Sequence, residues 1–223
     1  MAAVNKLKRA KVPNRTKGLD RPETPAPTEG EGDRRVRRTR QTLHEALIEL
    51  VLEKGFDAIT IKELVARADV GRSTLYAHHG GKEGLLRDGL MSLRTRLLAE
   101  QRAAFERPPG APDRLLGYSG AFFAHVHAYR QVFHALVHRG GAAIVMDGLR
   151  RLLTDVVQGD VLAVAPSPRA GAMPLEAVTR FVVDGFVAVT LWWLEQSPQT
   201  SPAEVNAIFR RLALPALKSA GLP

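Results

Sequence analysis

Cysteine is absent from the 223 residues of this chain. A disulfide framework, a thiol nucleophile, an iron–sulfur cluster and any cysteine-based zinc module are therefore excluded. Long apolar runs are absent too, since the most apolar stretch, residues 181–194, is short and contains Asp184. Because a membrane-spanning helix needs about 20 apolar residues, we expect this stretch to form a buried helix and we expect no membrane partner.

Acidic residues are fewer than basic ones. The chain has 23 Asp and Glu against 32 Lys and Arg, which gives a net charge of +9 and a sequence pI near 10.3. Residues 1–40 hold 12 of the basic residues and 5 of the acidic ones, so most of the surplus lies there. A basic surplus of this size favours a polyanionic partner such as nucleic acid or an anionic membrane surface.

The first 33 residues combine prolines, glycines and charges with no apolar periodicity. This composition predicts a disordered, basic, proline-rich tail. No continuous apolar core of about 7–15 residues follows the basic start, as a secretory signal would require. Pro13, Pro22, Pro25 and Pro27 argue against the amphipathic helix of a mitochondrial transit peptide.

From residue 34 onward the apolar residues recur at helical spacing, and no segment shows the alternation of a half-buried strand. Leu43, Leu47, Leu50 and Val51, for example, form one apolar stripe. We therefore expect an all-α protein. The expected helices cover residues 35–54, 60–68, 72–79, 82–107, 113–137, 142–157, 175–195 and 202–219, with a loose linker over residues 159–172.

Two of these helices lie very close together in the sequence. Thr60 and Glu63 have the spacing of a capping box, which predicts that the first of the two begins at Thr60. The three residues 69–71 separate it from the second helix, residues 72–79, which ends before Gly80. A link this short forces the two helices to cross steeply, and this arrangement is a helix-turn-helix.

The second helix of a helix-turn-helix enters the DNA major groove N-terminus first, so its opening residues are small, polar or basic. The guanidinium of Arg72 suits guanine O6 and N7, and the methyl group of Thr74 or Ala77 suits a thymine methyl. Some candidates also have structural alternatives: Thr60 as a helix cap alone, His78 as a solvated surface residue and Tyr76 as a packed ring. The predicted DNA contacts are Thr60, Arg72, Ser73, Thr74, Tyr76, Ala77, His78 and Lys82.

Three motifs, GFDAITIKELV at residues 55–65, VGRSTLYAH at 70–78 and KEGLL at 82–86, stand at a characteristic spacing. With these motifs, residues 40–86 resemble the N-terminal DNA-binding domain of the tetracycline-repressor (TetR) family. The resemblance implies phosphate contacts for Tyr76, His78 and Lys82.

Two residues depart from the family pattern. His79 stands where the family usually has an aromatic residue in the small core, and a buried imidazole needs a polar partner. Asp69 stands where a turn glycine is common, although Asp tolerates the left-handed conformation better than most residues.

The C-terminal half resembles, more weakly, a regulatory domain found in part of the same family. The similarity lies in Arg139-Gly140-Gly141, Pro174-Leu175-Glu176 and Trp192-Trp193-Leu194, among other short runs. It implies that the last two long helices pack against their copies in a second subunit, and the alternative is a core within one subunit. The predicted dimer-interface residues are Val189, Trp192, Trp193, Ile208, Phe209 and Leu212.

Apolar walls with few polar anchors are typical of small-molecule sites, and aromatic residues of the C-terminal half are candidates for one. The alternative is that they form the core, which is the commoner role of aromatic residues at helical spacing. Several histidines share a helical face, but no carboxylate matches their spacing, so we expect neither a metal nor a cofactor. The predicted pocket residues are Phe122, Phe123, Tyr129, Phe133, Met173, Phe181 and Phe186.

Enzyme signatures fail at particular residues. Position 48 is Ile where a zinc-protease motif starting at His44 needs a second histidine, and position 76 is Tyr where a phosphate-binding loop ending at Lys82 needs glycine. No G-x-S-x-G elbow occurs. We therefore do not expect an enzyme, although an enzyme and a basic-tail binder of nucleic acid or membrane surfaces, indifferent to sequence, remain alternatives.

These observations together predict a sequence-specific transcriptional regulator, most simply a repressor, that acts as a homodimer on double-stranded DNA and responds to a small-molecule inducer. We expect it in the bacterial cytoplasm, associated with the nucleoid. The predicted organisation is a tail (1–33), a DNA-binding domain (34–81), a connecting helix (82–110) and a helical regulatory and dimerisation domain (111–223).

Overall fold

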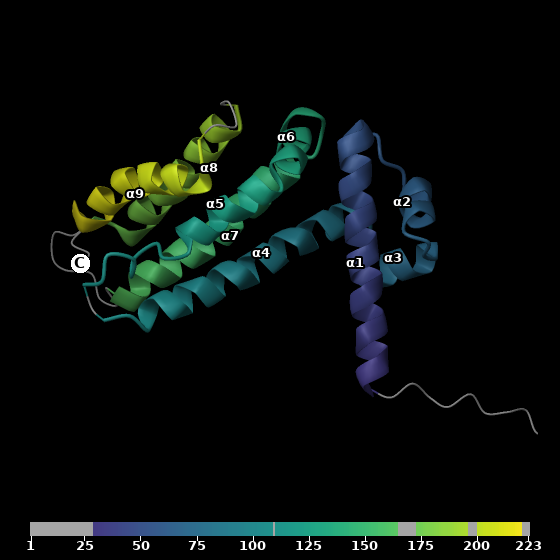
Figure 1. Ribbon diagram of the computed structural model, residues 1–223, viewed down its shortest axis with the longest axis horizontal. Coiled ribbons are helices and arrows are strands. Elements are labelled where there is room, and N and C mark those ends of the chain that lie inside the picture. The colour runs from purple at the N-terminus through teal and green to yellow at the C-terminus, as the bar shows by residue number, and fades with distance from the viewer. Residues whose placement is uncertain (1–28, 109, 165–172, 196–199, 220–223) are drawn as a thin grey trace, which may run out of the picture.

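The computed structural model describes residues 29–108, 110–164, 173–195 and 200–219. All secondary structure in these ranges is helical, which confirms the expected all-α class (Figure 1). The helices are α1 (Glu29–Lys54), α2 (Ile61–Arg67), α3 (Arg72–His79), α4 (Lys82–Phe105), α5 (Ser119–Ala128), α6 (Arg130–His138), α7 (Ala142–Val164), α8 (Leu175–Glu195) and α9 (Pro202–Ser219).

Several helix boundaries differ from those expected. Residues 1–28 of the predicted tail lie outside the described residues, but α1 begins at Glu29, so residues 29–33 are helical. Helix α7 continues through Gly159 to Val164, which corrects the first part of the predicted linker. The rest of that linker, residues 165–172, lies outside the described ranges.

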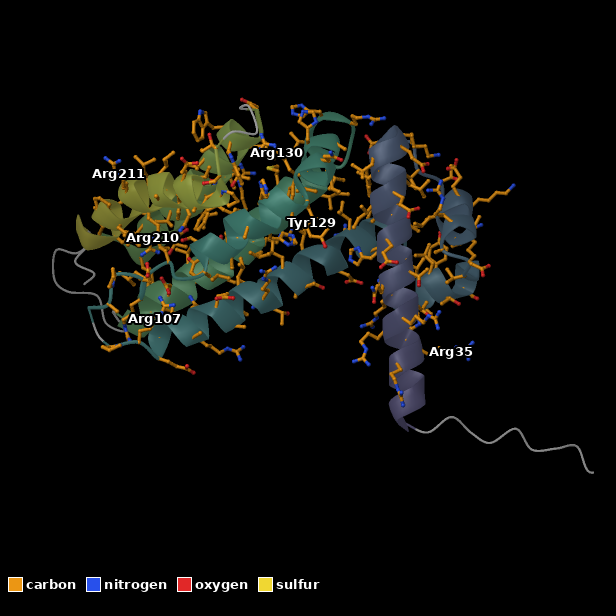
Figure 2. The ribbon with its side chains drawn as sticks, viewed as in Figure 1. Arg35, Arg107, Tyr129, Arg130, Arg210 and Arg211 are labelled. Atoms are coloured by element: carbon orange, nitrogen blue, oxygen red, sulfur yellow. The ribbon has the colours of Figure 1, made fainter. Side chains whose placement is uncertain are left out.

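The largest difference concerns the single helix expected over residues 113–137. Residues 112–118 form turns, because Arg210 on α9 donates to the carbonyls of Pro112, Leu115 and Leu116 (Figure 2). The helical segment that follows is interrupted at Tyr129, whose φ of −111° and ψ of 23° separate α5 from α6. Contacts from a distant helix therefore override the local apolar periodicity.

Helix α1 lies between the α2–α3 pair and the bundle formed by the remaining helices (Figure 1). The α1–α3 unit is held by a small apolar core that includes Leu43, Leu47, Phe56, Leu64 and Leu75, each almost fully buried. Helix α4 packs on α1 and α3 at one end and along α7 in the bundle. It is therefore the element shared by both parts.

The bundle has an aromatic core. Phe122, Phe123, Phe186 and Phe209 are buried and contact one another, with the Phe186 and Phe209 ring centroids 3.7 Å apart. Helix α8 is long and apolar enough to span a membrane by length and composition. It packs between α7 and α9, however, which matches the expectation of a buried helix.

A loop of the bundle also contacts the N-terminal unit. The guanidinium of Arg139, which follows α6, donates to the carbonyls of Leu52 and Glu53 at the end of α1. Gly55 has φ +82°, and a Cβ there would lie 2.4 Å from the Arg139 carbonyl oxygen. This contact places α6 directly against the end of α1.

Candidate nucleic-acid interface

Thr60 begins the first helix of the helix-turn-helix, as the capping box predicts. Its hydroxyl accepts from the Glu63 amide at 3.3 Å, and the Glu63 carboxylate accepts from the Thr60 amide at 3.0 Å. Hydrogen bonds from the Lys54 ammonium, and next from Thr60, lower the pKa of Glu63 to about 2. The capping role of Thr60 is therefore present in the structure, and a phosphate contact would be additional to it.

The turn between α2 and α3 depends on Asp69, which has φ 51°. The amide of the next residue, Val70, donates back to the Val65 carbonyl at 3.0 Å. Leu75 of α3 and Leu64 of α2 are fully buried where the helices cross. The sequence 69–71 thus makes the tight turn that a helix-turn-helix requires.

Helix α3 exposes most of the residues predicted to contact DNA. Arg72, Ser73, Tyr76 and Ala77 are exposed, and Thr74 and His78 are half-buried. The Arg72 guanidinium carbon lies 5.6 Å from the centroid of the Tyr76 ring. Gly71 precedes the helix and provides no side-chain cap. The first turn of α3 therefore presents its backbone N–H groups and its polar side chains together.

Lys82 occupies a different position from the one predicted for it. Its ammonium donates to the carbonyls of Phe56, Asp57 and Ile59, at 3.1, 3.2 and 2.9 Å. An ammonium has three N–H donors, so these three carbonyls use all of them. The structure therefore places Lys82 as a tie between α4 and the loop before α2, not as a side chain directed at phosphate.

His79 has the polar partner that a buried imidazole needs. Its side chain is 1% exposed, and Nδ1 pairs with the carboxylate of Asp88 on α4. Nε2 has no partner among the described residues. His44 of α1 lies nearby, and burial, followed by the charge of His79, lowers the pKa of His44. The end of α3 is thus joined to α4 by the contact between His79 and Asp88.

Helix α1 adds positive charge beside this surface. Arg35, Arg37, Arg38 and Arg40 are all exposed, and Figure 2 shows Arg35 on the end of α1 that projects away from the bundle. Arg67 of α2 differs, because its guanidinium bonds Glu49 and Glu53 of α1 at 2.7 to 3.0 Å. Arg37 and Arg40 line a cavity between α1 and the bundle, so only part of the positive charge of α1 belongs to the surface near α3.

The structure separates the residues predicted to line one ligand pocket. Phe122, Phe123 and Phe186 are fully buried in the aromatic core, whereas Met173 and Phe181 are 49% and 60% exposed. The three buried rings pack against one another, whereas Met173 and Phe181 face solvent, so the seven residues do not line one cavity in the described part of the chain. Only Tyr129 and Phe133 line a sizeable cavity, of about 630 Å³.

That cavity lies between the two parts of the molecule, with walls from α1, α4, α5 and α6. Its polar lining includes Arg40, His44, Arg96 and His125, none of which the sequence analysis singled out as pocket residues. They come from three helices far apart in the chain, and no local motif joins them.

The residues predicted for a dimer interface fall into two groups. Trp192, Ile208 and Leu212 are 42%, 37% and 62% exposed, and Val189 is half-buried. Trp193 and Phe209, by contrast, are buried within one subunit, and the Trp193 indole N–H donates to the Thr200 carbonyl at 3.0 Å. These two side chains belong to the core of the subunit.

Two family models match this chain. The model described as bacterial regulatory proteins of the tetR family matches residues 43–88, and one described as a transcriptional regulator C-terminal region matches residues 115–214. The chain belongs to the tetR family. In this tetR-family protein the first match covers the C-terminal part of α1, all of α2 and α3 and the start of α4, and the second runs from the turns before α5 into α9.

Curated relatives match parts of the chain. The HTH-type transcriptional regulator TcmR of Streptomyces glaucescens is 30% identical over 107 residues, which is 47% of this chain and 46% of TcmR. The uncharacterized HTH-type regulator YxbF of Bacillus subtilis is 40% identical over 55 residues, which is 24% of this chain and 14% of YxbF. The chain thus spans less than half the length of either relative.

A solved structure matches over most of the chain. FadR of Thermus thermophilus, a tetR-family transcriptional repressor solved in complex with lauroyl-CoA, has a TM-score of 0.57 and 22% identity. The match covers 80% of this chain and 94% of FadR. At this identity the comparison shows a shared fold.

Proposed function

We propose that this tetR-family protein is a sequence-specific DNA-binding transcriptional regulator, acting as a repressor in the bacterial cytoplasm. The observation that carries the proposal is the exposed face of α3, where Arg72, Ser73 and Tyr76 face solvent on a helix held by a buried core. A supported helix with polar and basic residues at its N-terminus is what major-groove recognition requires.

The contacts divide into two kinds. Arg72 pairs with guanine, and Thr74 or Ala77 contacts a thymine methyl, so these residues read the sequence. Tyr76, His78 and the N-terminus of α2 at Thr60 contact the flanking phosphates and set the register. Lys82 supports the interface indirectly, because it holds the loop that leads into α2.

A homodimer follows from the surface of the last two helices. Phe181, Val189 and Trp192 share one face of α8, and Ile208 and Leu212 extend it on α9. This stripe is apolar and partly exposed in one subunit, so a second copy that packs on it would remove it from water. Two α3 helices about 34 Å apart would then read a pseudo-palindromic site.

Response to a small-molecule inducer completes the proposal. FadR of Thermus thermophilus is named as a repressor in complex with lauroyl-CoA, which shows that this fold accommodates a ligand in that protein. In this chain an inducer that binds the DNA-incompetent arrangement more tightly would lower DNA affinity, and DNA would lower inducer affinity by the same factor.

The test is selection of bound sequences from a random double-stranded DNA pool at about 150 mM salt, where purely electrostatic binding is weak. We expect a pseudo-palindrome with half-sites about one helical turn apart. Folded protein that enriches no sequence, with binding that falls steeply with salt, would contradict the proposal and favour attachment through the basic tail.

Arg72→Ala gives the residue-level control for the same selection. If Arg72 reads guanine, the variant loses about 1–3 kcal/mol of binding free energy and relaxes specificity at one or two base positions. Equal weakening on all sequences would assign Arg72 to a phosphate contact instead.

A further inference from the structure

The cavity between the N-terminal unit and the bundle has an apolar interior. Leu47 and Val51 of α1, Leu93 of α4 and Leu136 of α6 contribute to its walls. Its volume of about 630 Å³ lies within the roughly 300–1,000 Å³ typical of small-molecule sites. Figure 2 marks Tyr129, another wall residue, at the joint between α5 and α6.

The lining of this cavity carries an excess of positive charge. Arg37 and Arg40 of α1 and Arg96 of α4 line it, and no ion pair or hydrogen bond joins these three guanidiniums to other described residues. The one carboxylate in the lining is that of Glu45, whose Oε1 accepts from the Gln41 amide at 2.9 Å. The lining therefore has two more positive than negative charges.

Two histidines add polar groups without adding charge at neutral pH. Burial, and next the positive charge of Arg96, lowers the pKa of His125 to about 4. Burial also lowers the pKa of His44. Gly89 lets the His44 ring approach α4, because a Cβ at that position would lie 2.7 Å from the ring. Neutral imidazoles offer a donor and an acceptor each, so they can orient a polar group of a ligand.

We infer that this interdomain cavity binds a small amphipathic anion, with an acidic group between Arg40 and Arg96 and an apolar body against the leucines of α1, α4 and α6. An apolar cavity with cationic groups and no matching carboxylates is complementary to such a molecule. A neutral ligand would leave the guanidiniums without partners, and a cation would be repelled.

Binding here would affect the DNA-binding unit directly. Arg40 belongs to α1, and Arg96 belongs to α4, which packs on α3 and pairs with His79 through Asp88. A bound anion therefore contacts both α1 and α4, and α4 is the helix that packs on α3. The effect of the anion on DNA binding rests on the proposed function, whereas binding of the anion to the cavity does not.

The experiment compares two probes with the same apolar body. One is 8-anilinonaphthalene-1-sulfonate, and the other is N-phenyl-1-naphthylamine, which lacks the sulfonate. Fluorescence titration of the full chain without DNA is expected to show one saturable site per chain that prefers the anionic probe. Absence of a saturable site, or equal affinity for both probes, would overturn the inference.

Matched variants locate the site. Arg40→Gln with Arg96→Gln is expected to weaken the sulfonate probe at least tenfold and to leave the neutral probe unchanged. Arg87→Gln with Arg102→Gln removes the same two charges from exposed positions of α4 outside the cavity, and it is expected to change neither. Equal weakening by this control would show that only overall charge matters and would refute the site.

NMR of the histidine rings provides an independent readout. The ring signals of His44 and His125 are expected to shift on addition of the sulfonate probe, whereas those of His138, outside the cavity, stay in place. A shift confined to His138 would place the probe elsewhere and contradict the inference.

Coupling to DNA is measured last, with the selected DNA sequence present. The affinity of the sulfonate probe is expected to change by the factor by which the probe changes DNA affinity. A probe that binds the cavity but leaves DNA affinity unaltered would remove the coupling while the site itself stands. If the protein binds no DNA sequence at all, that result contradicts the proposed function and leaves the anion site in place.

Discussion

At the scale of single residues, Lys82 shows how the fold decides which of two roles a side chain has. The residue type and its place after the recognition helix suit a phosphate contact, and the family resemblance implies one. In the structure its ammonium instead bonds three carbonyls that precede α2. No sequence pattern near Lys82 reveals those carbonyls, because they lie more than 20 residues earlier in the chain.

Lys82→Met tests this role. The variant keeps most of the apolar length but loses three hydrogen bonds from a charged donor, so the free energy of unfolding is expected to fall by about 2–3 kcal/mol. Urea denaturation measures this change. If stability is unchanged and only the salt dependence of DNA binding becomes shallower, Lys82 contacts phosphate after all.

Two titratable residues, the buried Asp160 and the half-buried His125, have opposite effects in the same pH range. Burial raises the pKa of Asp160 to about 6, so the folded state holds that proton more tightly than the unfolded chain. This contribution is fully present below pH 3.8 and is lost as the pH rises through 6. For His125, with a pKa of about 4, stability is present above pH 6.5 and is lost as the pH falls toward 4.

Single substitutions should separate the two effects. Relative to the parent protein, Asp160→Asn is expected to gain about 2 kcal/mol in unfolding free energy between pH 4 and pH 7. His125→Asn is expected to lose about 2 kcal/mol over the same interval. Denaturant unfolding at several pH values provides both numbers. Parallel pH profiles for parent and variants would contradict the assigned pKa directions.

At the scale of elements, helices with local end signals were predictable and those shaped by distant contacts were not. The capping box at Thr60 marks the start of α2, and Gly80, with φ +67°, ends α3 at the expected residue. Leu116 was not predictable as a break, because its φ of 54° accompanies a hydrogen bond from its backbone N–H to the carboxylate of Asp160, 44 residues away. The turn of the helix-turn-helix was predictable in part. Its position at residues 69–71 follows from the sequence, but Asp69 marks a left-handed conformation less clearly than glycine does.

Asp69→Gly probes that turn. Asp69 adopts a left-handed conformation, which costs a residue with a Cβ more than it costs glycine. The variant is therefore expected to gain about 0.5–1 kcal/mol in unfolding free energy, with DNA specificity retained. Asp69→Ala is the control and should lose stability. A less stable glycine variant would mean that the aspartate side chain itself stabilises the turn.

At the scale of the whole molecule, the surface proposed to bind DNA could be put forward from the sequence because it comes from one continuous stretch, residues 60–78. The interdomain cavity combines side chains from α1, α4, α5 and α6, so its composition emerges only when the chain is folded. The proposed dimer stripe was predictable from the sequence only in part. Its helices were foreseen, but the burial of Trp193 and Phe209 depends on how α8 and α9 rotate against the bundle.

Leu212→Glu tests the dimer. Leu212 is 62% exposed, so a glutamate leaves the subunit folded but places a charge in the proposed apolar interface. Sedimentation equilibrium should show monomers at concentrations where the parent is dimeric, and DNA affinity should fall roughly 100-fold because the two half-sites are no longer linked.

The matched control is Ala207→Glu, an exposed position of α9 next to the stripe. It introduces the same side chain and should remain dimeric with normal DNA affinity. A Leu212→Glu variant that is still dimeric would exclude the stripe as the subunit interface.

Helix α4 has 24 residues and reaches from the far end of the bundle to the recognition helix. At a rise of about 1.5 Å per residue it is a lever of about 36 Å. A tilt of about 5° at one end therefore moves the other by about 3 Å, and two subunits double this to about 6 Å. Against a half-site repeat of about 34 Å, that displacement moves the second recognition helix by nearly two base pairs along the groove.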